Sequence, residues 1–385
     1  SDPLLLNWEK VTGEAVIPIL NPDGSTPPYN VFDPCIWKKD NYYYSLSGGT
    51  LPSGPGGKIV RANFLLRSKD LTKWEYLHPF VEDDRFTQIG DDGACPYFWP
   101  IGNRHMLLFF SHISGGQYLL GDYDLNRDKF VVTHHDKFNF GSYNPAGVHA
   151  PSATPDGQGG IIVIFNMNPG KPTKGWDQIM TLPRRLTLIG NDTVGTEPIG
   201  DIESLRYNYQ HIDTVKLPAN EEVIINDISG NAMEIAAKID TKEAPMIELN
   251  VLRSPNKEEF TRIAFFRNRG FRNRGQFPVV NAGPNFYESA RYSLISIDSS
   301  YSSLSPDVLS RAPETGSFII GQDESLQLRV FIDKSIVEVF VNGKQCLALR
   351  VYPSRNDSVG ISLRSQGQDA KLISLDAWQM KNIYD

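Results

Sequence analysis

Three aspartates and one histidine lie within five residues before prolines that open apolar segments of this sequence. They are Asp33, Asp91, Asp92 and His149. Carboxyl groups gathered at one place can exchange protons or stabilise a developing positive charge, and a pair flanking a glycosidic bond is the usual apparatus for hydrolysing it. A histidine there can bind a hydroxyl group or transfer a proton. We therefore take the three aspartates as catalytic candidates and His149 as a substrate-binding candidate.

The prolines belong to a repeated pattern that predicts how these side chains are positioned. At Pro34, Pro96 and Pro151, a residue–proline pair is followed by apolar residues, a polar turn and a dense aromatic or aliphatic strand. The three prolines lie 62 and 55 residues apart. A repeat of this kind with four strands per unit is typical of a β-propeller blade. We expect the candidate side chains at the inner mouth of successive blades.

A second repeat concerns the strands that close the blades. Residues 1–9 resemble residues 68–75, and Trp8 and Trp74 hold matching places in the two segments. The likeness predicts that the chain begins in the closing hairpin of an earlier blade. The sequence then contains three full blades and one partial blade.

The pattern changes near residue 200. From there onward, short strands alternate apolar and polar residues, as in two packed antiparallel sheets. Asn342 and Gly343 lie between two β-branched runs, and this dipeptide favours a tight hairpin turn with positive φ at both positions. The sequence predicts an all-β protein with a β-propeller over residues 1–200 and a β-sandwich over residues 201–385.

The charge balance argues against several kinds of partner. The 385 residues carry 38 Lys+Arg against 45 Asp+Glu, for a net charge of -7. Nucleic acid and anionic membrane surfaces are therefore not expected as main partners. No run of about 18 apolar residues is present, so no segment is predicted to span a bilayer. A neutral ligand such as a sugar is compatible with this composition.

The cysteines give little sign of a disulfide framework or a metal site. Three cysteines are an odd number and too few for a disulfide scaffold. Cys35 and Cys95 hold matching places in two repeats, so a disulfide or a soft-metal pair is one interpretation. Without neighbouring histidines the metal signal is weak, and buried free thiols are favoured. We expect no metal and no cofactor.

Several motifs together resemble glycoside hydrolase family 32, the family of β-fructosidases, invertases and levanases. The resemblance begins at Phe32-Asp33-Pro34 and Ala94-Cys95-Pro96, continues through 118–124 and 203–206, and reaches the hairpin at 331–344. It covers almost the whole chain. It implies a β-propeller of the five-bladed type, of which three to four blades are evident here, followed by a β-sandwich. It also implies hydrolysis of β-fructosides such as sucrose, inulin or levan.

The resemblance assigns roles to some positions and leaves others unfilled. An Arg-Asp-Pro motif of the family carries an aspartate that stabilises the transition state, and Asp33 stands at that place. A Glu-Cys-Pro motif carries the general acid, where this chain has Ala94. The nucleophile motif is absent, because residues 21–24 hold similar residues in a different order and are predicted to form a surface turn. Asp91 or Asp92 is the candidate replacement carboxyl, with a turn entering the blade as the alternative.

Aromatic residues near the blade starts offer faces on which a sugar could stack. Trp37, Tyr97 and Trp176 join His149 as substrate-binding candidates, with core packing as the alternative interpretation for the aromatic residues.

Three functions are open at this point. The first is hydrolysis of a β-fructoside or a related glycan. The second is carbohydrate binding without catalysis, and the third is a glycosidase with rearranged carboxylates and a different substrate. We expect a carbohydrate partner and an extracellular or periplasmic location, reached by a signal sequence that is not part of this chain. The sequence makes no prediction of oligomeric state.

Overall fold

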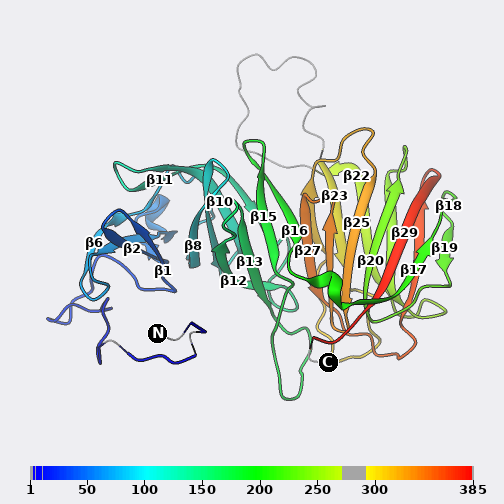
Figure 1. Cartoon of the computed structure of the whole chain (residues 1–385), viewed down its shortest axis with the longest axis horizontal. Coiled ribbons are helices and arrows are strands. Elements are labelled where there is room, and N and C mark those ends of the chain that lie inside the picture. The colour runs from blue at the N-terminus through cyan, green and yellow to red at the C-terminus, as the bar shows by residue number, and fades with distance from the viewer. Residues whose placement is uncertain (1–2, 5, 11, 271–291, 384–385) are drawn as a thin grey trace, which may run out of the picture.

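The fold is built almost entirely from β-strands. The computed structural model describes residues 3–4, 6–10, 12–270 and 292–383. Within these residues the helical elements are two short 3-10 turns, η1 (Pro55–Gly57) and η2 (Ile202–Leu205). No helix in the described ranges is long and apolar enough to cross a membrane. The all-β prediction is confirmed, as a propeller portion followed by a sandwich (Figure 1).

Three antiparallel sheets form successive blades of the propeller portion. Their orders are β1-β2-β5-β6, β7-β11-β10-β9-β8 and β12-β13-β15-β16, with β14 paired to β13. The bounds are β1 (Cys35–Lys39), β2 (Tyr42–Ser47), β5 (Phe64–Ser68), β6 (Trp74–Pro79), β7 (Val81–Glu82), β8 (Ala94–Ile101), β9 (Arg104–Ser111), β10 (Gly115–Asp124), β11 (Lys129–Lys137), β12 (Val148–Pro155), β13 (Ile161–Met167), β14 (Ile179–Met180), β15 (Arg184–Ile189) and β16 (Thr193–Pro198). A separate ribbon pairs β3 (Thr50–Leu51) with β4 (Val60–Arg61).

The first strand of each blade begins at one of the three residue–proline pairs. β1 follows Pro34 directly, and Pro96 and Pro151 lie inside β8 and β12. β8 contacts both β1 and β12, so the three starting strands are neighbours in space. The three blade starts predicted from the repeat are confirmed.

The predicted hairpin at the beginning of the chain is not formed. Within the described part of residues 3–34 no strand occurs, and the side chain of Trp8 is 78% exposed. Trp74, its match in the repeat, lies in β6, which pairs with β5. A strand requires a hydrogen-bonding neighbour, and no described strand pairs with this first segment. The likeness to residues 68–75 therefore did not predict the backbone of the described residues in this segment.

The sandwich consists of two antiparallel sheets that enclose one large apolar core. Their orders are β17-β29-β20-β25-β26-β27, with β18 paired to β29, and β19-β28-β21-β22-β23-β24. The bounds are β17 (Arg206–Ile212), β18 (Val215–Leu217), β19 (Glu222–Ile225), β20 (Ala232–Asp240), β21 (Met246–Arg253), β22 (Thr261–Gly270), β23 (Tyr292–Asp298), β24 (Glu314–Phe318), β25 (Leu326–Asp333), β26 (Ile336–Val341), β27 (Gln345–Arg350), β28 (Gly360–Gln366) and β29 (Ala370–Met380).

The hairpin between β26 and β27 has the predicted turn. Asn342 has φ 50° and Gly343 has φ 61°, so both central residues are left-handed. The amide of Lys344 donates to the carbonyl of Val341 at 2.9 Å, which closes the turn. This is the geometry that matches the right-handed twist of the two strands, and the prediction is confirmed.

A buried ionic contact joins the third blade to the sandwich. The guanidinium of Arg184 in β15 donates to the Glu338 carboxylate in β26 at 3.0 Å, and both side chains are almost fully buried. Glu338 also accepts the amide of Leu182 at 2.6 Å. Apolar residues of β26 and β27 pack into the core of the third blade. Figure 1 shows β16 beside β27 at this junction.

Candidate functional site at the propeller mouth

The three blade starts share an unusual backbone conformation. Asp33, Cys95 and Ala150 each precede a proline, and their φ values are 42°, 48° and 40°. Residues other than glycine rarely adopt the left-handed region, and a following proline restricts them further. The β8–β9 and β12–β13 ladders each shift register at this point. Such bulges redirect side chains and often occur beside functional sites.

Asp33 lies at the junction of the first and second blades. Its Oδ2 accepts the Cys95 amide at 3.3 Å and faces the Cys95 thiol at 3.4 Å. Asp33 is exposed, and among the described residues no salt bridge neutralises it. Burial and the neighbouring Asp33 carboxylate raise the pKa of the Cys95 thiol to about 12, so this thiol stays protonated. An exposed carboxylate that forms no salt bridge with the described residues is therefore available to a ligand.

Asp92 pairs with His112, which lies in the turn between β9 and β10. Its Oδ2 lies 2.6 Å from His112 Nδ1, and its Oδ1 accepts the His112 amide at 3.3 Å. Its backbone carbonyl also accepts the amide of Gly49 from the first blade. His112 was not predicted as a site residue. The pairing register of β8 with β9 could have indicated it. Ala94 pairs with Phe110, so Asp92, two residues before Ala94, comes opposite His112, two residues after Phe110.

His149 extends the site to the third blade. Its ring stacks on Tyr143 with centroids 5.9 Å apart and meets the edge of Phe110 at 4.5 Å. The His112 ring lies 6.3 Å away. Burial, and secondly the nearby His112, lowers the pKa of His149, and its Nδ1 is buried without a hydrogen-bond partner. A neutral imidazole in this place can exchange hydrogen bonds with a ligand hydroxyl.

Asp91 is buried among hydrogen-bond donors, whereas the neighbouring Asp92 is partly exposed. The Asp91 carboxylate is fully buried and accepts the Ser111 hydroxyl at 2.6 Å, the Ser114 hydroxyl at 2.5 Å and the Gln88 amide at 2.7 Å. Three donors occupy the carboxylate and hold the loop that enters β8. The geometry therefore does not support a catalytic role for Asp91, in contrast to the prediction.

Two of the three predicted stacking residues lie in packed cores. The Trp37 ring stacks on Tyr44 with centroids 5.7 Å apart and contacts Phe98 at 5.5 Å, inside the aromatic cluster between the first two blades. Tyr97 packs against the core of the second and third blades. Both residues are partly buried, and their contacts contribute to the packing of the blades. Sugar binding by Trp37 and Tyr97 stays a prediction.

Trp176 is the stacking candidate that retains an open surface. It is 46% exposed, and the guanidinium of Arg350 lies 5.0 Å from its ring. Gly175 beside it is left-handed, with φ 84°. No measured contact links Trp176 to Asp33 or Asp92, so its role in substrate binding stays a prediction.

The segment with the scrambled nucleophile-like residues forms a turn, as predicted. The Gly24 amide donates to the Asn21 carbonyl at 2.9 Å. Asp23 accepts both the amide and the hydroxyl of Ser25 at 2.9 and 2.6 Å. Its carboxylate is thus occupied within its own turn.

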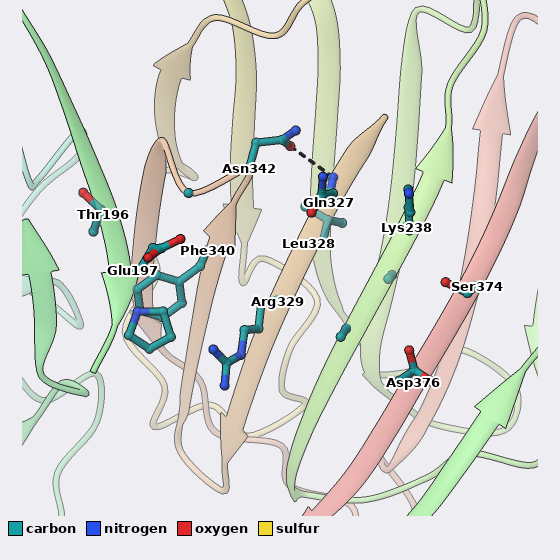
Figure 2. Close-up of a pocket in the computed structure, with 14 residues that line it drawn as sticks. Thr196, Glu197, Lys238, Gln327, Leu328, Arg329, Phe340, Asn342, Ser374 and Asp376 are labelled. Atoms are coloured by element: carbon teal, nitrogen blue, oxygen red, sulfur yellow. Dashed lines mark hydrogen bonds between the residues drawn. The ribbon is translucent and has the colours of Figure 1, made fainter. Parts of the chain in front are cut away.

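A recess on the sandwich lies apart from these residues. It has a volume of about 370 Å³ and lies between β16 and the outer face of the sheet that carries the Asn342–Gly343 turn. Figure 2 shows Glu197 beside Phe340, and Arg329 projecting from the neighbouring strand. None of the predicted site residues lines it. We place the candidate site at the propeller mouth, where the exposed carboxylate, the Asp–His pair and the left-handed residues meet.

Comparison with known proteins extends over the whole chain. Residues 2–198 match the description "Glycosyl hydrolases family 32 N-terminal domain", and residues 201–379 match "Glycosyl hydrolases family 32 C terminal". Beta-fructofuranosidase, insoluble isoenzyme 1, from Oryza sativa subsp. japonica is 25% identical over 450 residues, covering 99% of this chain and 71% of that protein.

Solved structures share the same fold. The crystal structure of fructan 1-exohydrolase IIa from Cichorium intybus has a TM-score of 0.79 at 20% identity and covers 99% of this chain and 77% of that chain. A variant of that enzyme in complex with 1-kestose has a TM-score of 0.73 at 19% identity and covers 93% and 74%. The likeness shows the architecture, and the family descriptions span both parts of the chain. The chain therefore belongs to glycosyl hydrolase family 32, a family of glycosidases.

Proposed function

We propose that the propeller mouth binds the fructosyl unit of a β-fructoside and that the protein hydrolyses its glycosidic bond. The observation that carries the proposal is Asp33. It is an exposed carboxylate without a salt bridge among the described residues, held on a left-handed residue between two blades. Such a group can accept sugar hydroxyls and stabilise the positive charge of an oxocarbenium-like transition state.

The names of the relatives support this substrate class. They include a β-fructofuranosidase and a fructan exohydrolase, and one structural neighbour was solved with 1-kestose. Hydrolysis of sucrose or of a fructan is the corresponding reaction for this chain. Because polymeric fructans do not cross membranes unaided, an extracellular or periplasmic location remains part of the proposal.

Two positions make this site unlike the family pattern. Phe32, which is half exposed, replaces the arginine before Asp33, so a cation is absent from the rim. Ala94 replaces the glutamate of the Glu-Cys-Pro motif, and a methyl group cannot donate a proton. Asp92 is the nearest carboxylate in sequence with an exposed surface, but it is engaged by His112.

A second candidate function is carbohydrate binding without hydrolysis. Ala94 is the observation that favours it, because loss of the general acid removes a contribution of about 10²- to 10⁴-fold to the rate. Recognition of the sugar by Asp33 and His149 would survive that loss. The two candidates therefore differ in turnover and agree on where the sugar lies.

The Asp33→Asn variant tests the proposed function with sucrose, inulin and levan. Loss of the negative charge is expected to reduce kcat at least about 100-fold, because the charge acts mainly in the transition state. Asp40→Asn is the matched control, since Asp40 is an exposed, left-handed aspartate just beyond the other end of β1. It should leave kcat and KM unchanged.

Calorimetric titration with 1-kestose completes the test. Turnover by the unaltered protein that is lost in Asp33→Asn supports the proposed hydrolysis at this site. Saturable binding that depends on Asp33, together with no turnover, selects the binding function. Undiminished turnover in Asp33→Asn rejects the site.

A further inference from the structure

The place where the family carries its general acid contains no proton donor in this chain. Ala94 is buried, and its partner in the β8–β9 ladder is Phe110, which cannot donate a proton either. A donor for the leaving oxygen must therefore come from a neighbouring position. Two residues beyond the Ala94–Phe110 pair, before β8 and after β9, are Asp92 and His112.

The Asp92–His112 pair has the geometry of a positioned acid. The carboxylate holds Nδ1 at 2.6 Å and also accepts the His112 amide at 3.3 Å, so both the ring and its backbone are fixed. With Nδ1 engaged by Asp92, Nε2 is the nitrogen left to face a substrate. The side chains of His112 and Asp92 are 58% and 27% exposed, so the imidazole is accessible.

The surroundings connect this pair to the proposed substrate site. The ring centroids of Phe110 and His149 lie 5.3 and 6.3 Å from that of His112. Cys95, three residues after Asp92, donates its amide to Asp33 at 3.3 Å, and burial together with both aspartates raises the pKa of its thiol. The ionisable groups around His112 are therefore Asp92 from the loop before β8, His149 from β12, and Cys95 with Asp33 on the side of the first blade.

We propose that His112 is the proton donor of this enzyme and that Asp92 positions it. The inference rests on the proposed hydrolysis. The bond between the anomeric carbon and the bridging oxygen breaks, and its electron pair remains on that oxygen, which takes the Nε2 proton of the His112 imidazolium. The anomeric carbon becomes an oxocarbenium ion beside Asp33. Water then adds to this carbon and returns a proton to the neutral imidazole.

Substrates with different leaving groups separate a proton donor from a structural residue. Sucrose releases a poor alkoxide that must be protonated, whereas 4-nitrophenyl β-fructofuranoside releases a stable phenolate without a proton. In His112→Gln, kcat/KM for sucrose should fall by about 100-fold or more, and for the aryl fructoside by about fivefold at most.

The control is an exposed Asp–His pair on the sandwich. His211 Nδ1 lies 2.7 Å from Asp376 on the sandwich, so His211→Gln removes an equivalent pair far along the chain from the mouth. It should leave both substrates unaffected. Asp92→Asn keeps the His112 ring in place but removes its charged partner. In this variant kcat/KM for sucrose should fall selectively, but by less than in His112→Gln.

The outcomes distinguish this inference from the proposed function. An equal loss on both substrates, or no loss on sucrose, overturns His112 as the donor while Asp33-dependent hydrolysis stands. Absence of turnover with Asp33-dependent binding of 1-kestose overturns the donor and retains the sugar site. Absence of both turnover and binding overturns the proposed function and the inference together.

Discussion

Two adjacent aspartates show how burial decides what a carboxylate can do. Asp91 is enclosed and holds three donors, whereas Asp92 is partly open and holds one histidine. In the sequence the two residues are equivalent candidates, because they are adjacent and together precede Gly93. The structure separates them by burial, since Asp91 is fully buried and the side chain of Asp92 is 27% exposed.

Substitution of the buried aspartate is expected to reduce stability. In Asp91→Asn an amide NH₂ replaces an oxygen that accepts serine hydroxyls, which leaves buried polar groups imperfectly paired. The free energy of unfolding should fall by about 1–3 kcal/mol. Urea denaturation of Asp91→Asn beside Asp92→Asn measures this, and the second variant should change stability by less than about 1 kcal/mol. Equal losses would contradict the distinction between the two.

Residues fixed by local sequence were predictable, and residues fixed by long-range register were not. Asp33 could be placed at a blade mouth because its residue–proline pair is a local signal. His112 could not, because its partner Asp92 lies 20 residues away across a hairpin whose register shifts near Ala94. For Trp37 the sequence left both interpretations open, because an aromatic ring can stack on a sugar or pack in a core equally well.

At the scale of elements, a left-handed residue before a proline is the shared feature of the three blade starts. Asp33, Cys95 and Ala150 have this conformation, and in the second and third blades the ladder beside it also shifts register as a bulge. The cost of such a conformation for an L-residue is about 1–2 kcal/mol. The surrounding sheets meet this cost, because neighbouring strands fix the backbone beside the left-handed residue.

Glycine at the third blade start is expected to stabilise the protein. Ala150→Gly removes the left-handed penalty but increases the entropy of the unfolded chain, so the net gain in unfolding free energy should be about 0.5–1 kcal/mol. Ala153→Gly, in the same strand but without positive φ, should instead cost about 1 kcal/mol. Thermal and urea denaturation of the two variants compare the signs. A loss of stability in both would show that the bulge is not strained.

At the scale of the whole molecule, the sandwich is part of the support of the propeller portion. Arg184 and Glu338 meet where water is excluded, and apolar side chains of β26 and β27 enter the core of the third blade. Burial raises the pKa of Glu338, whereas Arg184 opposes that shift. The outer strands of the third blade, β15 and β16, are therefore held against the sandwich.

Removal of one member of this buried pair is expected to be costly. Glu338→Ala leaves the Arg184 guanidinium and the Leu182 amide without their acceptor, and should lower the unfolding free energy by about 3–5 kcal/mol. Glu75→Ala breaks the exposed pair with Arg67 and should cost less than about 1 kcal/mol. Denaturation curves of the two variants provide the comparison, and similar losses would show that the buried pair does not join the domains.

The repetition of a left-handed residue before proline in three blades has an evolutionary consequence. Each blade presents the same two adjacent positions to the mouth, occupied by Phe32–Asp33, Ala94–Cys95 and His149–Ala150. Descent from a duplicated ancestral blade would produce such equivalent positions. A reactive group lost from one of these positions can then be regained at the equivalent position of another blade, or at the next residue pair along the same ladder. The main chain need not change. The fold thus allows a catalytic role to move from one blade to another while Asp33 stays where it is.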